Sequence, residues 1–202
     1  MNKILGNLNL QGLVCGFDFH FGYKGSGNVQ FLQDNAPYEI CVVSAVEDEQ
    51  GKISSTRITK CIEQGHMEEA NRLLGSPFCM EGKVIHGKKR GTDMGFPTAN
   101  VQVSDEYIIP KNGVYAGKIH VGRNSYGCMI NIGLNPTFHD VDAISLEANI
   151  FDFHEDIYGQ VVSVDFLKFI RPEKQFRSKS NLVMQLEQDK RTIQKYFEEG
   201  VL

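Results

Sequence analysis

Residues 82–100 have the most unusual composition in the chain, with four glycines and four lysine or arginine residues. Glycine lets backbone N–H groups approach phosphate oxygens, and lysine or arginine adds positive charge. The spacing differs from the GxxxxGK[ST] loop of many nucleotide-binding proteins. A solvated hairpin would have the same composition, so a phosphate-binding loop is one of two interpretations of this stretch.

The stretch ends in Pro97-Thr98-Ala99-Asn100. In an extended backbone, residues two apart point to the same face, so the Thr98 hydroxyl and the Asn100 amide would share one face. Oxygen atoms of this kind suit Mg²⁺, which usually also keeps waters and substrate phosphates. The alternative interpretation is a turn that begins at Pro97 and is closed by polar side chains.

A carboxylate follows in a segment with strand-like alternation. Over residues 144–150 the apolar residues point one way, while Ser145, Glu147 and Asn149 point the other. Such a carboxylate is usually just exposed to solvent. If its face lines a cleft beside Thr98 and Asn100, however, Glu147 is placed to act as a general base towards an alcohol.

Three other segments carry weaker signals. Residues 169–176 combine arginine, proline and phenylalanine, which suits either the edge of a ligand site or an ordinary loop. Residues 16–22 have an aromatic residue at every second position. Residues 54–57 offer hydroxyls and an arginine at an expected helix N-terminus, which suits anions, although ordinary helix caps look the same.

The elements that must position these residues change in character near Pro77. Before it, residues 38–46 are rich in apolar and β-branched residues and predict a buried strand. A helix is expected after the hydroxyls at 54–56 and a second over 67–74, ending at Gly65 and Gly75. Strand followed by helix is typical of α/β units, so residues 1–75 are expected to form a partial α/β segment.

After Pro77 the pattern is mainly β. Strands are expected over 114–120, 126–132, 144–151 and 161–169, separated by glycines. Short strands at near-regular spacing predict a barrel or a sandwich. Leu182, Leu186, Ile193 and Phe197 form one stripe of a terminal helix, which would pack on that β-structure. Residues 76–202 are therefore expected to form the second unit, and the whole chain an α+β protein.

Composition narrows the function classes. The net charge of −4 and the pI near 5.9 argue against a basic nucleic-acid binder. No apolar run reaches the length of about 20 residues that a membrane-spanning helix needs. The five cysteines form no CxxC pair, which favours free thiols in a reducing cytoplasm over a zinc site.

Taken in order, these motifs resemble the bifunctional bacterial riboflavin kinase/FAD synthetase family over essentially the whole chain. The signature of the kinase domain is Gly95-Phe96-Pro97-Thr98-Ala99-Asn100. Segments 131–138, 156–159 and 170–173 follow in the family's order. Segments 16–22 and 53–58 resemble the second half of the adenylyltransferase domain, and 69–75 resembles the link between the two domains.

The resemblance implies a fold and an activity. The fold is a six-stranded riboflavin-kinase-like β-barrel with a C-terminal helix, preceded by a partial Rossmann-like nucleotidyltransferase segment. The activity transfers the γ-phosphate of ATP to the 5′-hydroxyl of riboflavin and yields FMN, in a flavin-binding cytoplasmic transferase. The implied partners are riboflavin and ATP with Mg²⁺, without nucleic acid or membrane, and self-association through residues 1–75 is a further expectation.

The resemblance also implies residue roles. Glu147 would be the catalytic base, and Thr98 and Asn100 would bind Mg²⁺ and the ATP phosphates. Arg171 and Glu173 would bind the flavin. The other expected ATP-binding residues lie in the loop that would cover the nucleotide, and they are Gly82, Gly87, Lys88 and Gly95.

Three departures from the family pattern qualify this prediction. The adenylyltransferase carries an HxGH motif, which this chain lacks, and its first histidine is His20. FAD synthetase activity is therefore expected to be absent. Asn149 stands where the family often has histidine, and Thr92 follows Gly91 where arginine is commoner. Lys88, Lys89 and Arg90 would compensate for that missing charge.

Two rival functions remain at this point. One is a non-catalytic flavin- or nucleotide-binding protein with a regulatory role, which the truncation and Asn149 motivate. The other is a barrel that binds nucleic acid through the basic residues of 83–90. The acidic overall charge and the absence of interleaved aromatic residues in that segment argue against it.

Overall fold

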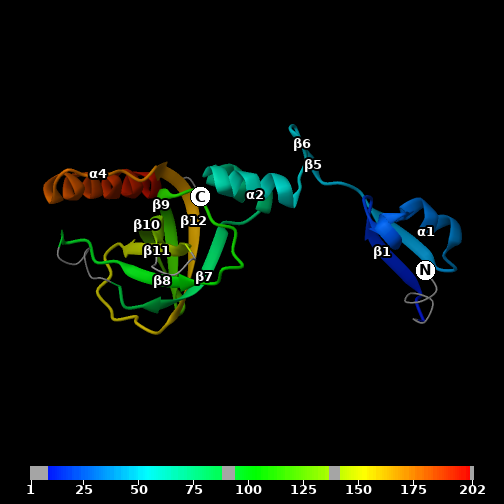
Figure 1. The fold of residues 1–202 in the computed structure, drawn as a ribbon, viewed down its shortest axis with the longest axis horizontal. Helices are drawn as coiled ribbons and strands as arrows, with labels where there is room; N and C mark the ends of the chain where they lie inside the picture. Colours follow the sequence, from blue (N-terminus) through cyan, green and yellow to red (C-terminus); the bar gives the residue numbers. More distant parts are fainter. Residues whose placement is uncertain (1–8, 88–93, 137–141, 201–202) are drawn as a thin grey trace. The chain divides into compact units, whose positions relative to one another are not determined.

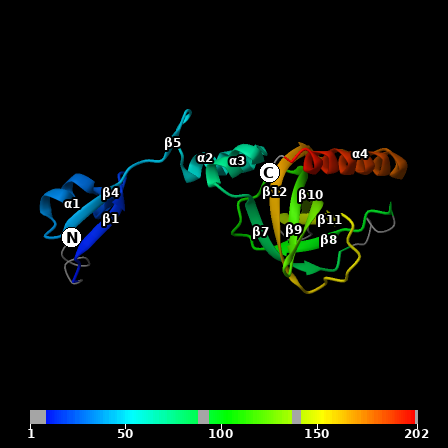
Figure 2. The same cartoon turned by 180° about the vertical axis from the view of Figure 1, so that it is seen from behind.

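The computed structural model describes residues 9–87, 94–136 and 142–200. The chain divides into two compact units, Met1–Ser54 and Ser55–Leu202, which are described here separately (Figures 1 and 2). Among the described residues, no helix combines the length and the apolar character that crossing a membrane requires.

The N-terminal unit contains a small parallel sheet made of β1 (Gly12–Gly16) and β4 (Glu39–Val43), in which Cys15 pairs with Val42. Its other elements are short, and they are β2 (His20–Phe21), η2 (Tyr23–Gly25), β3 (Gly27–Asn28), α1 (Val29–Asn35), β5 (Glu47–Asp48) and β6 (Gly51–Lys52). Helix α1 starts at Asn28, whose side chain accepts a hydrogen bond from the Phe31 N–H at 2.9 Å.

The prediction of a buried strand over residues 38–46 is wrong in one respect. The strand exists as β4, but its residues alternate between exposed and half-buried, and Val43 is 51% exposed. The reason is the size of the sheet. A strand with one neighbour in a two-stranded sheet leaves an edge and much of its side-chain surface open to water.

The second unit is built on a closed barrel of six strands, as expected, in the order β10-β11-β8-β7-β12-β9. All neighbouring strands in it pair antiparallel. Closure leaves none of these strands as a sheet edge, which settles the choice between barrel and sandwich. The strands are β7 (Phe78–Ile85), β8 (Ala99–Val103), β9 (Gly113–Val121), β10 (Asn124–Pro136), β11 (Asp142–Ile150) and β12 (Val161–Arg171).

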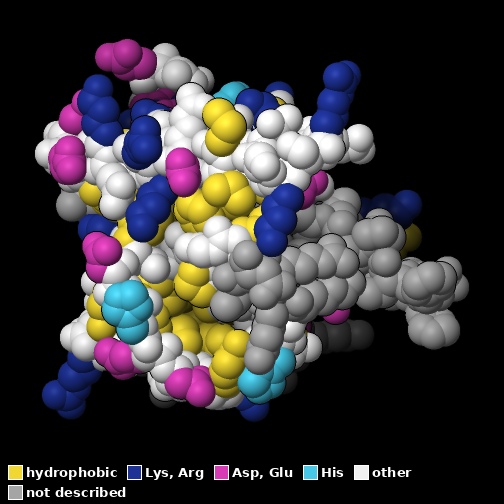
Figure 3. Space-filling model, turned by 90° about the vertical axis from the view of Figure 1, so that its left-hand side faces the viewer, with side chains coloured by type: hydrophobic (Ala, Val, Ile, Leu, Met, Phe, Trp, Pro, Cys, Tyr) yellow, Lys and Arg dark blue, Asp and Glu magenta, His cyan; other side chains and the backbone are white. Residues whose placement is uncertain are grey.

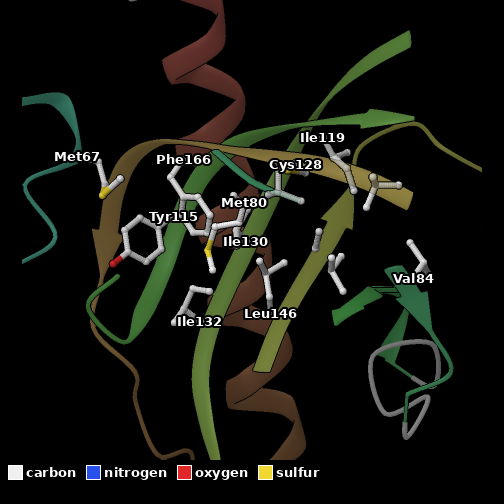
Figure 4. Packing of buried hydrophobic residues seen from close by; sticks show 14 of the residues in the cluster. Met67, Met80, Val84, Tyr115, Ile119, Cys128, Ile130, Ile132, Leu146 and Phe166 are labelled. Carbon is white, nitrogen blue, oxygen red and sulfur yellow. The ribbon is translucent and has the colours of Figure 1, made fainter. Parts of the chain in front are cut away.

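The barrel interior is filled by apolar side chains from alternating positions (Figure 4). Tyr115 and Phe166 are its largest fully buried side chains, and their rings meet edge to face with centroids 5.3 Å apart. Phe169 approaches Tyr115 in the same way at 5.1 Å. Around them lie Met80, Val84, Ile119, Cys128, Ile130, Ile132 and Leu146.

Helices α2 (Ser55–Gln64) and α3 (Met67–Leu74) belong to the barrel unit. Ile62, Met67 and Ala70 are buried in the same cluster as the barrel interior. The Asn71 side chain donates to the carbonyl of Phe166 and accepts from the N–H of Phe78, both at 2.8 Å. These contacts place the division between the compact units before α2, about 20 residues earlier than the predicted boundary at 75/76.

Helix α4 (Lys179–Glu198) follows the last barrel strand in the sequence and packs on the barrel exterior. The Ser178 side chain caps it by accepting a hydrogen bond from the Asn181 N–H at 3.2 Å. The predicted apolar stripe is confirmed for Leu186, Ile193 and Phe197, which join a second apolar cluster on the barrel surface, but not for Leu182, which lies outside that cluster. That cluster also contains Val114, Ala116, Met129, Phe151, Leu167 and Tyr196.

Candidate functional site

One cavity of about 970 Å³ opens between the barrel and α4. This end of the unit is seen in Figure 3, where hydrophobic side chains lie in a hollow with charged side chains around it. The cavity is lined by Ile85, His86, Gly87, Met94, Phe96, Thr98, Asn100, Val114, Met129, Asn131, Glu147, Asn149, Arg171, Glu173, Lys174, Gln175, Phe176, Leu182 and Leu186.

Thr98, Asn100 and Glu147 meet on one wall of this cavity. Asn100 lies in β8 directly opposite Glu147 in β11, which is an antiparallel pair. The Thr98 hydroxyl donates a hydrogen bond to Glu147 Oε2 at 3.4 Å. Residues 49 positions apart in the sequence thus place a hydroxyl, an amide and a carboxylate side by side.

Neighbouring polar side chains support this wall. The Ser145 hydroxyl donates to the other Glu147 oxygen at 3.4 Å, and Asn131 of β10 pairs with Glu147 from the opposite side. Asn149 is 5% exposed, and its amide donates to the carbonyl of Pro97 at 2.7 Å. Because that carbonyl belongs to the residue before Thr98, Asn149 fixes the backbone that presents the Thr98 hydroxyl.

The predicted glycines have different places. Gly87 lines the cavity, and a Cβ there would lie 2.2 Å from the Asn100 amide nitrogen, so a larger residue would force the Asn100 side chain to move. Gly82 lies inside β7, where a Cβ would come within 2.3 Å of the Gln102 carbonyl oxygen, and it does not line the cavity. Gly95 is exposed with φ +80°. Lys88 lies outside the described residues.

Another part of the cavity lining is formed by the end of β12, the segment after it and α4. Arg171 Nε donates to both carboxylate oxygens of Asp189, at 3.1 and 2.9 Å, and its Nη2 lies 2.7 Å from Oδ2. Its Nη1 donates to the carbonyl of Pro172 at 2.9 Å. Glu173 lies over Gly133 of β10, since a Cβ on that glycine would be 2.7 Å from Glu173 Oε1.

A second cavity of about 300 Å³ lies on the other side of the Thr98 segment. Thr98 lines both cavities. The His86 ring from the large cavity contacts the Tyr158 ring from the small one, with centroids 3.8 Å apart and the ring planes tilted by 32°. The other lining residues are Val84, Pro97, Ala99, Ala148, Ile150, Phe153, His154, Glu155, Asp156 and Ile157.

Sequence reasoning assigned no role to Asn131, His86 or Asp189. Asp189 had a visible signal, because it lies three residues after Leu186 and four before Ile193 and so interrupts the apolar stripe of the last helix. Asn131 and His86 lie in segments that the sequence brought out, 131–138 and 82–100, but nothing local distinguished them there. Their place in the cavity depends on strand pairing and on a ring contact over a long sequence separation.

This geometry can support one kind of chemistry well. A carboxylate with hydroxyl and amide neighbours can accept a proton from an alcohol, while the remaining oxygen atoms suit a hard cation or phosphate. In the described residues, no group of three His, Cys, Asp or Glu side chains is arranged to hold a metal ion. A cation here would therefore take most of its ligands from a bound phosphate and from water.

Comparison with known proteins gives two family matches. Residues 74–197 match the riboflavin kinase family model, and residues 1–57 match the FAD synthetase model. The bifunctional riboflavin kinase/FMN adenylyltransferases of Listeria monocytogenes and Bacillus subtilis are 43% and 40% identical, each over 98% of this chain. The chain spans 63% and 64% of the lengths of these two relatives.

A solved structure gives the corresponding comparison in three dimensions. It is a Streptococcus pneumoniae protein described as a macrolide-efflux protein, 40% identical with a TM-score of 0.86. The match covers 94% of this chain and 62% of that one. It therefore shows that the two chains share a fold over nearly all of this sequence.

Proposed function

Because the chain belongs to the riboflavin kinase family, we propose that it transfers the γ-phosphate of ATP to the 5′-hydroxyl of riboflavin, giving FMN and ADP. The observation that carries this proposal is the Glu147 carboxylate within hydrogen-bond reach of Thr98 and opposite Asn100, in the wall of the large cavity. Transfer of a phosphoryl group to an alcohol needs a base that accepts the alcohol proton, and a carboxylate can be that base. It also needs groups that position the phosphates and their cation, and neutral hydroxyl and amide oxygens can serve as ligands for that cation.

In the proposed reaction, Glu147 accepts the proton of the riboflavin 5′-hydroxyl while the 5′-oxygen of riboflavin forms a bond to the γ-phosphorus of ATP. The bond between that phosphorus and the bridging oxygen of ATP breaks, and ADP leaves with the electron pair. Phosphoryl transfer depends mainly on positioning and on neutralising charge. Ser145 and Thr98, which donate to the two Glu147 oxygens, would hold the carboxylate in place for this step.

The two cavities suggest how two substrates would meet. We place riboflavin in the large cavity, whose apolar residues and Arg171 suit a flat ring system with polar edges. We place the nucleotide base in the small cavity and its phosphates along Thr98, which lines both cavities. This arrangement brings the γ-phosphate to the wall that carries Glu147.

Mg²⁺ would enter with ATP. The Thr98 hydroxyl and the Asn100 amide oxygen fit this ion, since both are hard oxygen donors lining the large cavity. Bound there, the ion would neutralise charge on the phosphates. Gly87 packs directly against the Asn100 amide, so a side chain at position 87 would displace the group proposed to hold the ion.

We infer further that this polypeptide does not convert FMN to FAD. Its sequence contains no HxGH motif, which the adenylyltransferase half of the resembled family carries. The expected product of the chain by itself is therefore FMN alone.

The decisive experiment incubates the purified protein with riboflavin and MgATP and separates the flavins by chromatography. We expect FMN without FAD. Glu147→Gln should lower kcat by about 10²–10⁴-fold, because the proton acceptor is lost, while riboflavin binding persists. Glu81→Gln on β7, which is exposed and outside both cavities, is the matched control and should retain full turnover.

Other outcomes would change the proposal. Unchanged turnover in Glu147→Gln would remove Glu147 from the role of base. Formation of FAD would contradict the inference about the adenylyltransferase half. Riboflavin binding without any FMN from the wild-type protein would favour a regulatory flavin-binding protein over an enzyme.

A further inference from the structure

Helix α4 carries a buried carboxylate that the proposed chemistry does not use. Asp189 is 2% exposed and occupies a position on the apolar stripe of the helix. Its two oxygens accept hydrogen bonds from Arg171 Nε, and Oδ1 also accepts from Gln185 Nε2 at 2.8 Å. A buried charge is tolerated only when it is paired and hydrogen-bonded in this way.

Stability alone is a weak reason for such a pair. The cost of removing two charges from water often exceeds their mutual attraction, and apolar residues of similar size would fill the same space. A leucine at position 189 would continue the stripe formed by Leu186 and Ile193. We therefore ask which groups the Asp189–Arg171 pair holds in position through its polar contacts.

Every one of these contacts leads to the same cavity wall. Arg171 lines the large cavity, its Nη1 holds the Pro172 carbonyl, and its guanidinium lies 5.9 Å from the centre of the Phe176 ring. Gln185 links the network to Lys174, which donates to Gln185 Oε1 at 3.3 Å. Residues 171–176, which form this wall, are thus fastened to α4 by two side chains of the helix.

The pair also leaves Arg171 able to bind a ligand. An arginine carries five N–H groups, one on Nε and two on each Nη. Asp189 and the Pro172 carbonyl engage Nε and one N–H on each Nη. In the described part of the chain, the second N–H of each Nη has no partner, so the guanidinium is held rigidly with donors to spare.

We propose that Asp189, supported by Gln185, is a positioning residue that holds Arg171 and the 171–176 wall in the arrangement that binds the flavin ring. This rests on the proposed function. The effect falls on riboflavin affinity and not on phosphoryl transfer, because in the described residues the hydrogen bonds of this network run among Asp189, Arg171, Gln185, Lys174 and the Pro172 carbonyl, and none of them reaches Glu147. Preorganising a binding group lowers the cost of ordering it when the ligand arrives.

The test measures KM for riboflavin, KM for ATP and kcat in Asp189→Asn and Gln185→Met. Asparagine keeps the shape of Asp189 but removes its charge, so Arg171 loses its fixed orientation. We expect the riboflavin KM to rise about tenfold or more in Asp189→Asn and less in Gln185→Met, since small misplacements of a binding group are costly. The ATP KM and kcat should change by less than about threefold. Gln188→Met, on the exposed side of the same helix, is the control and should match the wild type.

The proposal is tested by whether the riboflavin KM changes while the ATP KM and kcat do not. Parallel losses in kcat and both KM values, or an unchanged riboflavin KM in folded Asp189→Asn, would overturn the proposal and leave Asp189 a structural role. If Asp189→Asn fails to fold, Gln185→Met decides in the same way, because it keeps the Asp189–Arg171 pair and breaks only its support. An unchanged riboflavin KM in that variant overturns the proposal.

Failure of the proposed function would be visible separately. A wild-type protein that makes no FMN overturns the kinase proposal, and quenching of riboflavin fluorescence on titration then measures binding directly. Weaker riboflavin binding by the two variants, with Gln188→Met unchanged, would still support the role of Asp189. Equal binding by all four proteins, or no binding by the wild type, would overturn it.

Discussion

The two units of the chain use similar β-forming sequences with different results. In the N-terminal unit, Val14 of β1 and Val43 of β4 are 67% and 51% exposed, although they lie in runs of apolar residues. In the barrel unit, Ile119, Ile130 and Val164 each have at least one polar neighbour in the sequence and are nevertheless fully buried. The difference lies in how many neighbours each strand has, and not in the strand sequences.

Closure of the barrel gives the second unit a common buried interior. Each of its strands pairs on both sides, so one set of alternating side chains points into a common interior. The opposite set is free to carry polar groups, and Glu147 and Asn100 lie on it. A closed core thus provides the rigid framework on which the candidate site is built.

Truncating one apolar side chain in each unit is the most direct test of this difference in burial. Phe166→Ala removes a fully buried ring that contacts Tyr115 and Phe78, and it should lower the free energy of unfolding by about 3–5 kcal/mol. Val43→Ala should cost less than about 1 kcal/mol, because the side chain is largely solvated already. Urea unfolding followed by circular dichroism measures both values, and equal costs would contradict the contrast between the units.

A smaller effect is expected at the site. Asn149→Ala removes the hydrogen bond to the Pro97 carbonyl and frees the backbone that presents Thr98. We expect kcat for FMN formation to fall about tenfold, because the misplaced hydroxyl no longer supports Glu147. Asn35→Ala in the N-terminal unit removes a similar but exposed side-chain bond, to the Phe31 carbonyl. Its turnover should be unchanged, and a comparable loss there would mean that both units support catalysis.

The smallest expected effect is a pH dependence of stability that comes from Cys79. Cys79 in β7 is exposed, but partial desolvation of its thiol raises the pKa to about 11, and the adjacent Asp165 carboxylate adds to the shift. Because the folded state disfavours the thiolate, this group's contribution to stability is complete below pH 9. It should be lost progressively as the pH rises from about 9 to 11.

Alkylation with iodoacetamide, read by peptide mass spectrometry, checks this shift. Since the thiolate is the reactive form, the rate at Cys79 should keep rising up to about pH 11. The exposed Cys41 of the N-terminal unit is the comparison within the same molecule. A rate at Cys79 that levels off by pH 9 would show that the barrel does not perturb this thiol.

Much of the local structure was predictable from the sequence. The helix over Met67–Leu74 has the expected bounds, and the strands from β9 to β12 fall where glycines and β-branched runs indicated. Both features depend on residues close together in the chain, through caps, turns and side-chain periodicity. The same local information brought out the segments around Thr98 and Glu147 as candidates for chemistry.

Only the tertiary structure decided which of these segments meet. Glu147 reaches Thr98 because β11 pairs with β8, and Arg171 reaches Asp189 because α4 packs back on the barrel surface. The burial of α2 and α3 against the barrel, and the exposure of β4, depend in the same way on neighbours far along the chain. Periodicity specifies which face of an element is apolar, whereas closure and register specify what that face contacts.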